Sequence, residues 1–334
     1  MAVVSIIVPA YNYARFLPDA LDSVLAQTFA DWECLIVDDG STDETPDVAQ
    51  RYVARDARFR YVRQDNRGLP AARNLGIRET GGKYLQFLDA DDKLAPAKLE
   101  VHARFLDENP GVDLVYSLAT FFRTEEPEKV LYSLHGNLSR PVLPKVGGNR
   151  DALRRLQQYN LSPPTTMFAR RTIVDRAGLF NESARACEDW DYWLRCAIAG
   201  CEIRYLDAGM PVAFIRTHRE SMSRSSERMI RGLIDAASTF HTTIAARQWN
   251  ASTLPAVYEM AMGVDAVEHG RRREGIRRLW TATRAATSSL SRLRWGVYTV
   301  AASLLPRRPF VWLVTRPMPE RGLELIRWLR PRRT

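Results

Sequence analysis

The sequence predicts an α/β protein with a mostly parallel central sheet, followed by a helical extension. Three observations point to this class. Strand-like and helix-like segments alternate through the first 120 residues, at the spacing of parallel strands joined by right-handed crossovers. Acidic residues stand directly after the second and the fourth of these strands. From about residue 229 onward the pattern is largely helical.

The first two elements follow from residue type and periodicity. Residues 3–8 are a β-branched run closed by Pro9, which is typical of a buried strand. In residues 18–27, Leu21 and Val24 fall on one face of a helix. We therefore expect a strand and then a helix.

The following elements are placed by turn and capping signals. Residues 33–37 form a second apolar run. Ser41 and Glu44 after it have the spacing of a capping box, so a helix is expected from there to about residue 55. The rest of this half is expected as a strand at 59–62, a helix at 69–78 and a strand at 84–88.

The pattern weakens after residue 122. Residues 125–148 are rich in proline, glycine and charge, and we expect a long loop or mobile lid there. Further helices are expected at 151–159 and 188–199, and a helical hairpin at 255–268 and 272–286.

Composition limits the class of protein. The 334 residues, 46% of them hydrophobic and 26% charged, suit one or two globular domains. The net charge of +9 is uneven: residues 271–334 hold sixteen arginines and three glutamates, a net +13, which leaves −4 for the rest. No apolar run of about 18 residues predicts a spanning helix. The four cysteines lack CxxC spacing and no signal peptide is evident, so we expect a cytoplasmic location and no zinc site.

The most informative stretch is the apolar strand that ends in Asp89, Asp91 and Asp92. Three carboxylates at one strand end repel one another unless a cation lies among them. A divalent metal with open positions for phosphate oxygens fits this arrangement; a solvated acidic turn is the alternative. Because ligands collect at the carboxyl ends of parallel strands, one cleft is expected to receive residues 9–12, 38–40 and 89–92.

Five motifs occur in consecutive order, each weak alone: residues 5–12, 36–43, 66–74, 88–92 and 187–191. Their order and spacing resemble the family 2 glycosyltransferases. The resemblance covers residues 1–225 and implies a catalytic domain there with the GT-A fold of nucleotide-diphospho-sugar transferases. From charge and helical pattern we expect residues 226–334 to be a basic, mainly helical extension. The resemblance also implies an inverting transfer of a sugar from a nucleotide diphosphate donor to an acceptor hydroxyl.

The resemblance assigns the donor site residue by residue. Asp89 and Asp91 match the DXD element of the family. A divalent metal, Mn²⁺ or Mg²⁺, is implied at Asp91, Asp92 and His218. Nucleotide-sugar binding is implied for Pro9, Ala10, Tyr11, Asp38, Asp39, Asn66, Arg73, Asp89, Ala90 and Asp91.

The strand-end pair Asp38 and Asp39 is expected to read the nucleobase. A carboxylate accepts a hydrogen bond from N3–H of uracil, a donor that cytosine lacks, and in the family this role favours Asp39. A UDP-sugar is therefore the expected donor. The alternative is that one of the pair caps the next helix. Tyr11 either lines the base or belongs to the core.

Glu188 and Asp189 are the candidate catalytic residues. The acceptor hydroxyl must lose a proton as it attacks, so a carboxylate base is needed. Trp190 and Trp193 follow in the expected helix, and apolar surroundings raise carboxylate basicity. The resemblance makes Asp189 the base and Glu188 a contacting or orienting group. Acids are also favoured in the first turn of any helix.

Two cationic candidates have structural alternatives. Arg73 suits bidentate phosphate contact, but it is one of many arginines and could be a solvated charge. His218 lies in residues 214–223, which resemble the segment that closes the donor site in relatives, and imidazole binds both metals and phosphates. A lone histidine is also often structural.

The basic tail suggests a partner. Its arginines are interleaved with tryptophans and a tyrosine, a combination that binds anionic membrane surfaces. Such contact suits an enzyme with a glycan or lipid-linked acceptor at the cytoplasmic face of the inner membrane, in cell-surface polysaccharide or glycolipid assembly. The alternative is that these helices cover the catalytic core or form a dimer surface, with the arginines in solvent. Nucleic acid is disfavoured as a partner because no matching motif occurs.

Two other functions compete with sugar transfer. A non-catalytic nucleotide-sugar-binding or membrane-scaffold protein would have no chemical need for the acids at the strand ends and at residues 188–189. A nucleotidyltransferase would need a glycine-rich phosphate loop after the first strand, where residues 9–12 carry no glycine.

Overall fold

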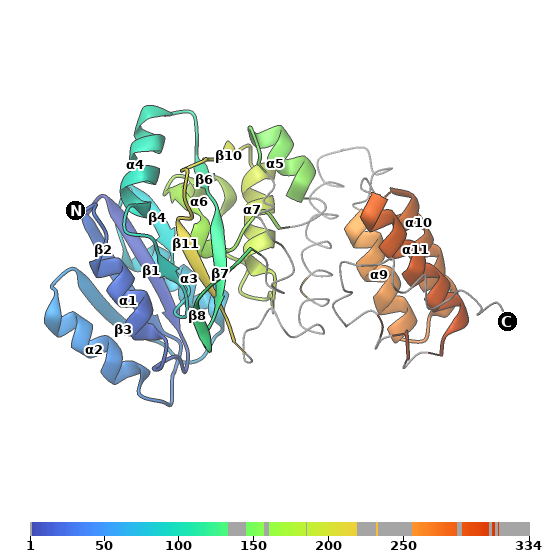
Figure 1. Cartoon of the computed structure of the whole chain (residues 1–334), viewed down its shortest axis with the longest axis horizontal. Coiled ribbons are helices and arrows are strands. Elements are labelled where there is room, and N and C mark those ends of the chain that lie inside the picture. The colour runs from blue at the N-terminus through green and yellow to red at the C-terminus, as the bar shows by residue number, and fades with distance from the viewer. Residues whose placement is uncertain are drawn as a thin grey trace. The chain divides into compact units, whose positions relative to one another are not determined.

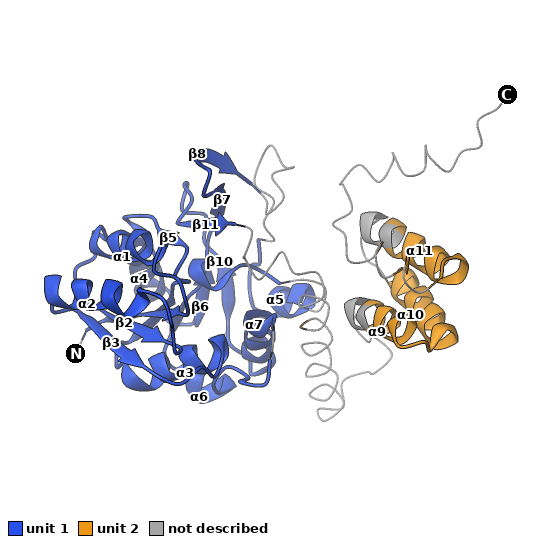
Figure 2. Cartoon of the chain, turned by 90° about the horizontal axis from the view of Figure 1, so that it is seen from below, with its two compact units in different colours: residues 1–221 blue, residues 222–334 orange. Residues whose placement is uncertain are grey.

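The computed structural model describes residues 2–132, 145–156, 160–184, 186–218, 232, 256–285, 289–306, 309–310 and 313. The chain divides into two compact units, residues 1–221 and residues 222–334 (Figure 2). The domain boundary predicted at residues 225/226 falls outside the described residues.

Unit 1 is built on a seven-stranded sheet in the order β10-β6-β9-β4-β1-β2-β3 (Figure 1). All neighbours are parallel except β9, which runs antiparallel to β4 and to β6. The strands are β1 (Val4–Ala10), β2 (Trp32–Asp38), β3 (Phe59–Arg63), β4 (Tyr84–Phe87), β6 (Leu114–Tyr116), β9 (Phe168–Arg170) and β10 (Ile203–Tyr205). The predicted α/β class with a mostly parallel sheet is confirmed.

A second sheet of four strands has the order β5-β11-β7-β8. Its strands are β5 (Lys93–Leu94), β11 (Ala213–Thr217), β7 (Ala119–Arg123) and β8 (Glu126–Leu131). The prediction of a loop through residues 125–148 is wrong for β8, which pairs antiparallel with β7. An edge strand with proline and charged residues has the composition of a loop. Residues 133–144 lie outside the described part.

Helices cover both faces of the main sheet. The even-numbered residues of β1 pack against the helices α1, α2 and α4, while α3 packs on the other face through Leu35, Val37 and Ala72. The helices are α1 (Leu17–Leu25), α2 (Thr45–Arg55), α3 (Leu69–Glu79), α4 (Lys98–Glu108), α5 (Asn149–Leu156), α6 (Ile173–Ala177) and α7 (Glu188–Ile198), with the 3₁₀ helix η1 (Pro164–Thr166). Burial on both faces explains why every residue of β1 except Ser5 is apolar.

The predicted capping box at the start of α2 is not formed. The helix begins at Thr45, and its N-cap residue Glu44 makes no side-chain capping bond. The Ser41 hydroxyl instead accepts the backbone N–H of Asn12 at 3.0 Å. Ser41 therefore ties the loop after β2 to the loop after β1, because tertiary contacts override local capping preferences.

Unit 2 contains three described helices, α9 (Ala256–Glu268), α10 (Arg272–Ala285) and α11 (Ser289–Leu304). The predicted pair α9 and α10 is present and packs closely: a Cβ at Gly275 would lie 2.7 Å from the carbonyl oxygen of Gly263. Among the described residues, no helix is long and apolar enough to cross a membrane.

Candidate active site

The parallel register brings the predicted strand ends together. Ala10 lies beside Asp38, and Ile7 lies beside Phe87 of β4. The loops after β1, β2 and β4 therefore leave the sheet at one edge, and that edge carries three of the five motifs.

Asp38 and Asp39 are both buried and hydrogen-bonded at this edge. Asp38 accepts the backbone N–H of Ser41 at 2.8 Å and the hydroxyl of Tyr61 at 2.7 Å. Asp39 accepts the backbone N–H groups of Arg67 at 2.9 Å and Gly68 at 2.8 Å. Since Gly68 is the N-cap of α3, Asp39 anchors the start of that helix.

The residues beside this pair differ in exposure. Pro9 and Ala10 are buried, and the Ala10 carbonyl accepts the backbone N–H of Asp39 at 2.9 Å. Tyr11 is 45% exposed, so it presents an aromatic face at the sheet edge rather than filling the core. Asn66 is also exposed.

The acidic turn after β4 is held in place by residues distant in sequence. Asp92 is buried: it accepts the Thr165 hydroxyl at 2.6 Å and the backbone N–H of Arg216 at 2.9 Å. The Arg216 guanidinium donates to the carbonyl of Asp91 at 2.8 Å and pairs with Asp19. The turn is therefore fixed from η1, β11 and α1 at once.

Asp91 and His218 converge beside that turn. His218 Nε2 lies 3.0 Å from a carboxylate oxygen of Asp91, and its ring packs against Phe16 with centroids 4.7 Å apart. Burial and the neighbouring Asp89 raise the pKa of Asp91, and His218 opposes that shift. Ala90, between the two aspartates, is buried.

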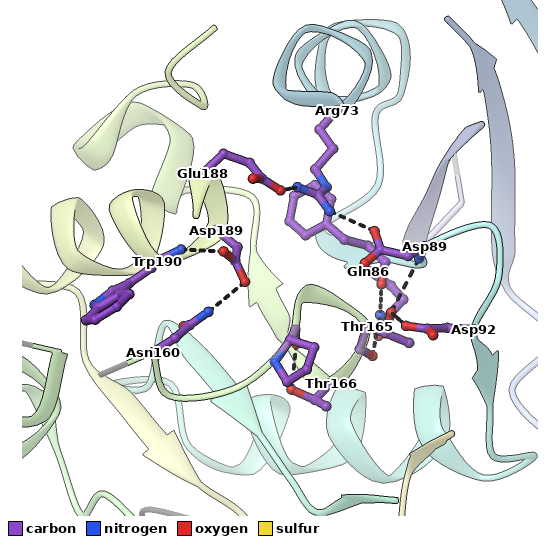
Figure 3. A network of polar contacts seen from close by, with 12 residues as sticks. Arg73, Gln86, Asp89, Asp92, Asn160, Thr165, Thr166, Glu188, Asp189 and Trp190 are labelled. Carbon is purple, nitrogen blue, oxygen red and sulfur yellow. Dashed lines mark hydrogen bonds and ion pairs between the residues drawn. The ribbon is translucent and has the colours of Figure 1, made fainter. Parts of the chain in front are cut away.

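Arg73 joins the acidic turn to α7 (Figure 3). Its guanidinium lies 2.7 Å from Asp89 and 2.5 Å from Glu188, and the side chain is only 1% exposed. The two carboxylates raise the pKa of Arg73 despite its burial. A buried arginine needs such partners, so Arg73 holds the strand-end acid and the α7 acid on either side of one cation.

Asp189 follows Glu188 in the first turn of α7. One carboxylate oxygen accepts the Asn160 amide at 2.7 Å and the other accepts the backbone N–H of Trp190 at 2.8 Å (Figure 3). Burial and the adjacent Glu188 raise the pKa of Asp189 to about 7, with Arg73 opposing the shift. A carboxylate with that pKa accepts and releases protons near neutrality.

Aromatic packing fixes the start of α7. Trp193 is buried against Phe87 and Phe180, and the Trp190 indole donates to the Leu156 carbonyl at 2.7 Å. Cys187, the N-cap residue, has a positive φ of 55°, a conformation that costs energy for a residue other than glycine. The positions of residues 188 and 189 are thus fixed by contacts of α7 with β4, with α5 and with the loop that contains Phe180.

The donor atoms near the acidic turn suit a divalent metal shared with a ligand. Asp91 and His218 supply a carboxylate and an imidazole, which Mn²⁺ accepts. No cluster of three or more His, Cys, Asp or Glu side chains with metal-site geometry occurs in the described ranges. Mg²⁺ and its relatives are commonly held by one or two carboxylates plus phosphate oxygens and water, so the residues fit a metal completed by a diphosphate.

Three residues that hold the candidate site in place were assigned no such role from the sequence. Arg216 lies within the segment 214–223, but the motif does not indicate that it holds the acidic turn. Thr165 lies outside the five motifs, and its hydroxyl binds Asp92. Asn160 gave no signal, because a single asparagine outside any motif is common in loops.

Proteins of similar sequence match more than half of the chain. An uncharacterized glycosyltransferase of Rickettsia felis is 35% identical over 195 residues, which are 58% of this chain and 30% of that protein. The uncharacterized glycosyltransferase EpsJ of Bacillus subtilis is 32% identical over 213 residues, 62% of this chain and 60% of its own. The chain therefore spans less than two thirds of these relatives.

Solved structures share the fold. S. aureus TarS 1–349 in complex with UDP superposes with a TM-score of 0.62 at 17% identity, covering 99% of this chain and 93% of that one. The mannosyltransferase PcManGT from Pyrobaculum calidifontis, in complex with GDP-Man and Mn²⁺, gives 0.55 at 19% identity, covering 94% and 84%. The fold is thus that of the GT-A glycosyltransferases.

A family model covers just over half of the chain. The description "Glycosyl transferase family 2" matches residues 5–176, a range that includes four of the five motifs in full. With the strand-end acids gathered at one edge of a GT-A sheet, the chain belongs to glycosyl transferase family 2.

Proposed function

We propose that the chain transfers a sugar from a nucleotide diphosphate donor to an acceptor hydroxyl, with inversion at the anomeric carbon. One observation carries this proposal: Arg73 contacts both Asp89 of the acidic turn and Glu188, the residue before Asp189. The acidic turn that we assign to the donor diphosphate and the helix start that carries a carboxylate with a pKa of about 7 therefore belong to one network.

The reaction follows from the roles of these groups. The acceptor oxygen attacks the anomeric carbon from the face opposite the diphosphate and forms the new glycosidic bond. Asp189 takes the proton of that hydroxyl. The bond from the anomeric carbon to the diphosphate oxygen breaks, and the nucleoside diphosphate leaves with the electron pair.

A divalent cation, Mn²⁺ or Mg²⁺, is proposed at Asp91 and His218, with Asp92 beside them. Such a cation neutralises charge that develops on the departing diphosphate. The carboxylate–imidazole pair supports this, as do the Mn²⁺ complexes of PcManGT and of GalNAc-T7. Asp92 serves in this proposal by keeping the turn in shape, since Thr165 and Arg216 already bind both of its oxygens.

The donor we propose is a UDP-sugar. Asp39 accepts three hydrogen bonds within the protein, and an ionised carboxylate has about four acceptor sites, so capacity for uracil N3–H remains. The exposed ring of Tyr11 lies on the same edge. TarS, which shares the fold, has been solved with UDP and with UDP-GlcNAc.

The acceptor we propose is a glycan or a lipid-linked glycan in cell-surface polysaccharide or glycolipid assembly, at the cytoplasmic face of the membrane. A PGL/p-HBAD biosynthesis glycosyltransferase of Mycobacterium bovis is 33% identical over 193 residues, 58% of this chain and 68% of its own. The net +13 of residues 271–334 suits an anionic membrane surface.

The test is calorimetric titration of UDP, GDP and dTDP into the full-length protein, with and without Mn²⁺. We expect Mn²⁺-dependent binding of UDP that Asp91→Ala abolishes. The matched control is Asp207→Ala, which removes an exposed aspartate that pairs with Lys145 and accepts the backbone N–H of Gly209, and it should leave binding unchanged. Failure of the folded protein to bind any of the three nucleotides with Mn²⁺ would favour a scaffold protein that keeps the fold.

A further inference from the structure

Helix α10 of unit 2 carries a stripe of exposed arginines and one tryptophan. Arg273, Arg277, Trp280 and Arg284 recur at intervals of four, three and four residues, and all four are exposed. At 3.6 residues per turn these positions fall on one face of the helix. Trp280 is 55% exposed, which is unusual for so large an apolar side chain.

Helix α11 carries an exposed aliphatic stripe of the same length. Leu293, Val300 and Leu304 are 43%, 58% and 74% exposed, and Val297 between them is partly exposed. Their spacing of four, three and four residues again places them on one face. The opposite side of α11 is buried through Trp295, Tyr298 and Ala302.

The two stripes face the same side of the α10–α11 pair. The helices are antiparallel: Arg272 at the start of α10 donates to the Ala302 carbonyl, while Thr283 near its end bonds Thr299. At about 100° per residue, the stripe of α10 lies about 90° from Thr283 and the stripe of α11 lies about 130° from Thr299, both measured in the direction of increasing residue number. Because the two helices run in opposite directions, rotation in this sense turns both stripes to the same side of the helix pair. We call this side the Arg–Leu face; it consists of Arg273, Arg277, Trp280, Arg284, Leu293, Val297, Val300 and Leu304.

In the described part of unit 2, three acidic side chains pair with arginines outside this face. Asp265 pairs with Arg271 at 2.9 Å, Glu274 with Arg271 and Arg278, and Glu259 with Arg278. Arg273, Arg277 and Arg284 make no ion pair with any residue in the described ranges. The arginines that turn toward α9 are thus neutralised, whereas those of the Arg–Leu face keep their positive charge.

We propose that the Arg–Leu face docks on the surface of an anionic lipid bilayer. Arginines attract anionic headgroups, tryptophan prefers the interface, and the aliphatic stripe gains by entering the acyl boundary. Nucleic acid would satisfy the arginines but leave the leucines and valines in water. The inference rests on the proposed function only for its biological purpose, which is to bring the transferase to a lipid-linked acceptor.

The test is co-sedimentation of the full-length protein with phosphatidylcholine vesicles that contain 30% phosphatidylglycerol or none. We expect binding to the anionic vesicles, with little binding to the neutral ones. The variant R273Q/R277Q/R284Q should bind at least tenfold more weakly. The matched control R51Q/R78Q/R104Q removes three exposed arginines of unit 1 and the same net charge, and it should bind like the wild type.

A second measurement tests contact with the aliphatic stripe. All four native cysteines are buried, so Val300→Cys offers a selective position for an environment-sensitive fluorophore. Anionic vesicles should shift its emission to the blue, and they should leave a label at Glu108→Cys in unit 1 unchanged.

Three results would overturn the inference. The first is wild-type protein that stays unbound to the anionic vesicles. The second is equal weakening by the two triple variants. The third is a label at residue 300 that is already shielded without lipid, which would mean that a second copy or another part of the chain covers the face. Nucleotide titration of the same samples tests the proposed function without a membrane. It therefore separates failure of the membrane inference from failure of the proposed function.

Discussion

Arg73 is the side chain on which the geometry of the candidate site depends most. It is buried, and it lies between Asp89 and Glu188, residues 16 and 115 positions away in the chain. Two carboxylates this close to each other would repel without a cation between them. Arg73 therefore positions the acidic turn and the start of α7, in addition to any phosphate contact it makes.

Removal of Arg73 should be costly. Arg73→Met leaves the buried Glu188 without its partner, and breaking a buried ion pair in this way costs about 3–5 kcal/mol. Chemical denaturation should show that loss in the free energy of unfolding. Arg67→Met, which breaks the exposed pair with Glu182, should cost at most about 1 kcal/mol. Equal effects of the two variants would contradict a structural role for Arg73.

Ionisation of Asp189 should determine how the reaction rate depends on pH on the acidic side. Because its pKa is raised to about 7, the base is ionised only above that value, so kcat/KM should rise with pH up to about 7 and then level. Asp189→Asn should lower turnover by about 10² to 10⁴ and leave UDP affinity unchanged. An unaltered pH profile in a variant that still turns over would remove Asp189 from the role of base.

The same pKa has a consequence for stability. The unfolded carboxyl ionises near 3.9 and the folded one near 7, so between these values the unfolded state releases its proton first. The native state therefore loses stability as pH rises from about 4 to 7. Asp189→Asn should flatten the dependence of the unfolding free energy on pH in that window, measured by urea denaturation at pH 5 and pH 7.5.

At the scale of elements, helix α4 supports the 3₁₀ helix η1 through a buried polar chain. Lys98 donates to the Thr166 carbonyl at 2.8 Å and lies 3.0 Å from His102, whose other ring nitrogen lies 2.9 Å from the Ser117 hydroxyl. Thr165 of η1 in turn binds Asp92. Lys98, which meets no carboxylate in the described part of the chain, therefore links α4 to η1 and, through Thr165, to the acidic turn.

Burial holds the pKa of Lys98 well below its usual value. Between the folded pKa and about 10.4 the unfolded chain binds a proton that the native chain does not, so stability should increase with pH through that range. Lys98→Met should reduce this increase between pH 7.5 and 9.5, as followed by urea denaturation. Lys145→Met, at an exposed site, is the control. His102 affects the pH dependence of stability only below about pH 6.5.

Helix α3 depends on a glycine where it crosses β1. A Cβ at Gly76 would lie 2.3 Å from Cγ2 of Ile7, so the helix could not stay at its present distance from the sheet. Gly76→Ala should destabilise the protein by about 1–3 kcal/mol, visible as a lower thermal midpoint. Gly111→Ala, where a Cβ meets nothing within 4 Å, should have little effect.

At the scale of the whole molecule, the two units divide the proposed tasks. Unit 1 contains the strand-end acids, Arg73, His218 and residues 188–189, whereas unit 2 contains the Arg–Leu face (Figure 2). Residues 1–221 alone should therefore bind UDP and Mn²⁺ as the full chain does, but should no longer sediment with anionic vesicles. Loss of nucleotide binding in a folded fragment would mean that unit 2 contributes to the site.

The sequence by itself determined the fold class, most elements of the first 120 residues and the strand ends where a site would form. Strand and helix periodicity are local properties, and parallel strands necessarily present their carboxyl ends at one edge. Only the tertiary structure decided how the acids are used. It placed Arg73 between Asp89 and Glu188, set Thr165 and Arg216 on Asp92, and paired β8 with β7. These contacts join residues far apart in the chain, and no local pattern encodes which distant partner a buried charge will meet.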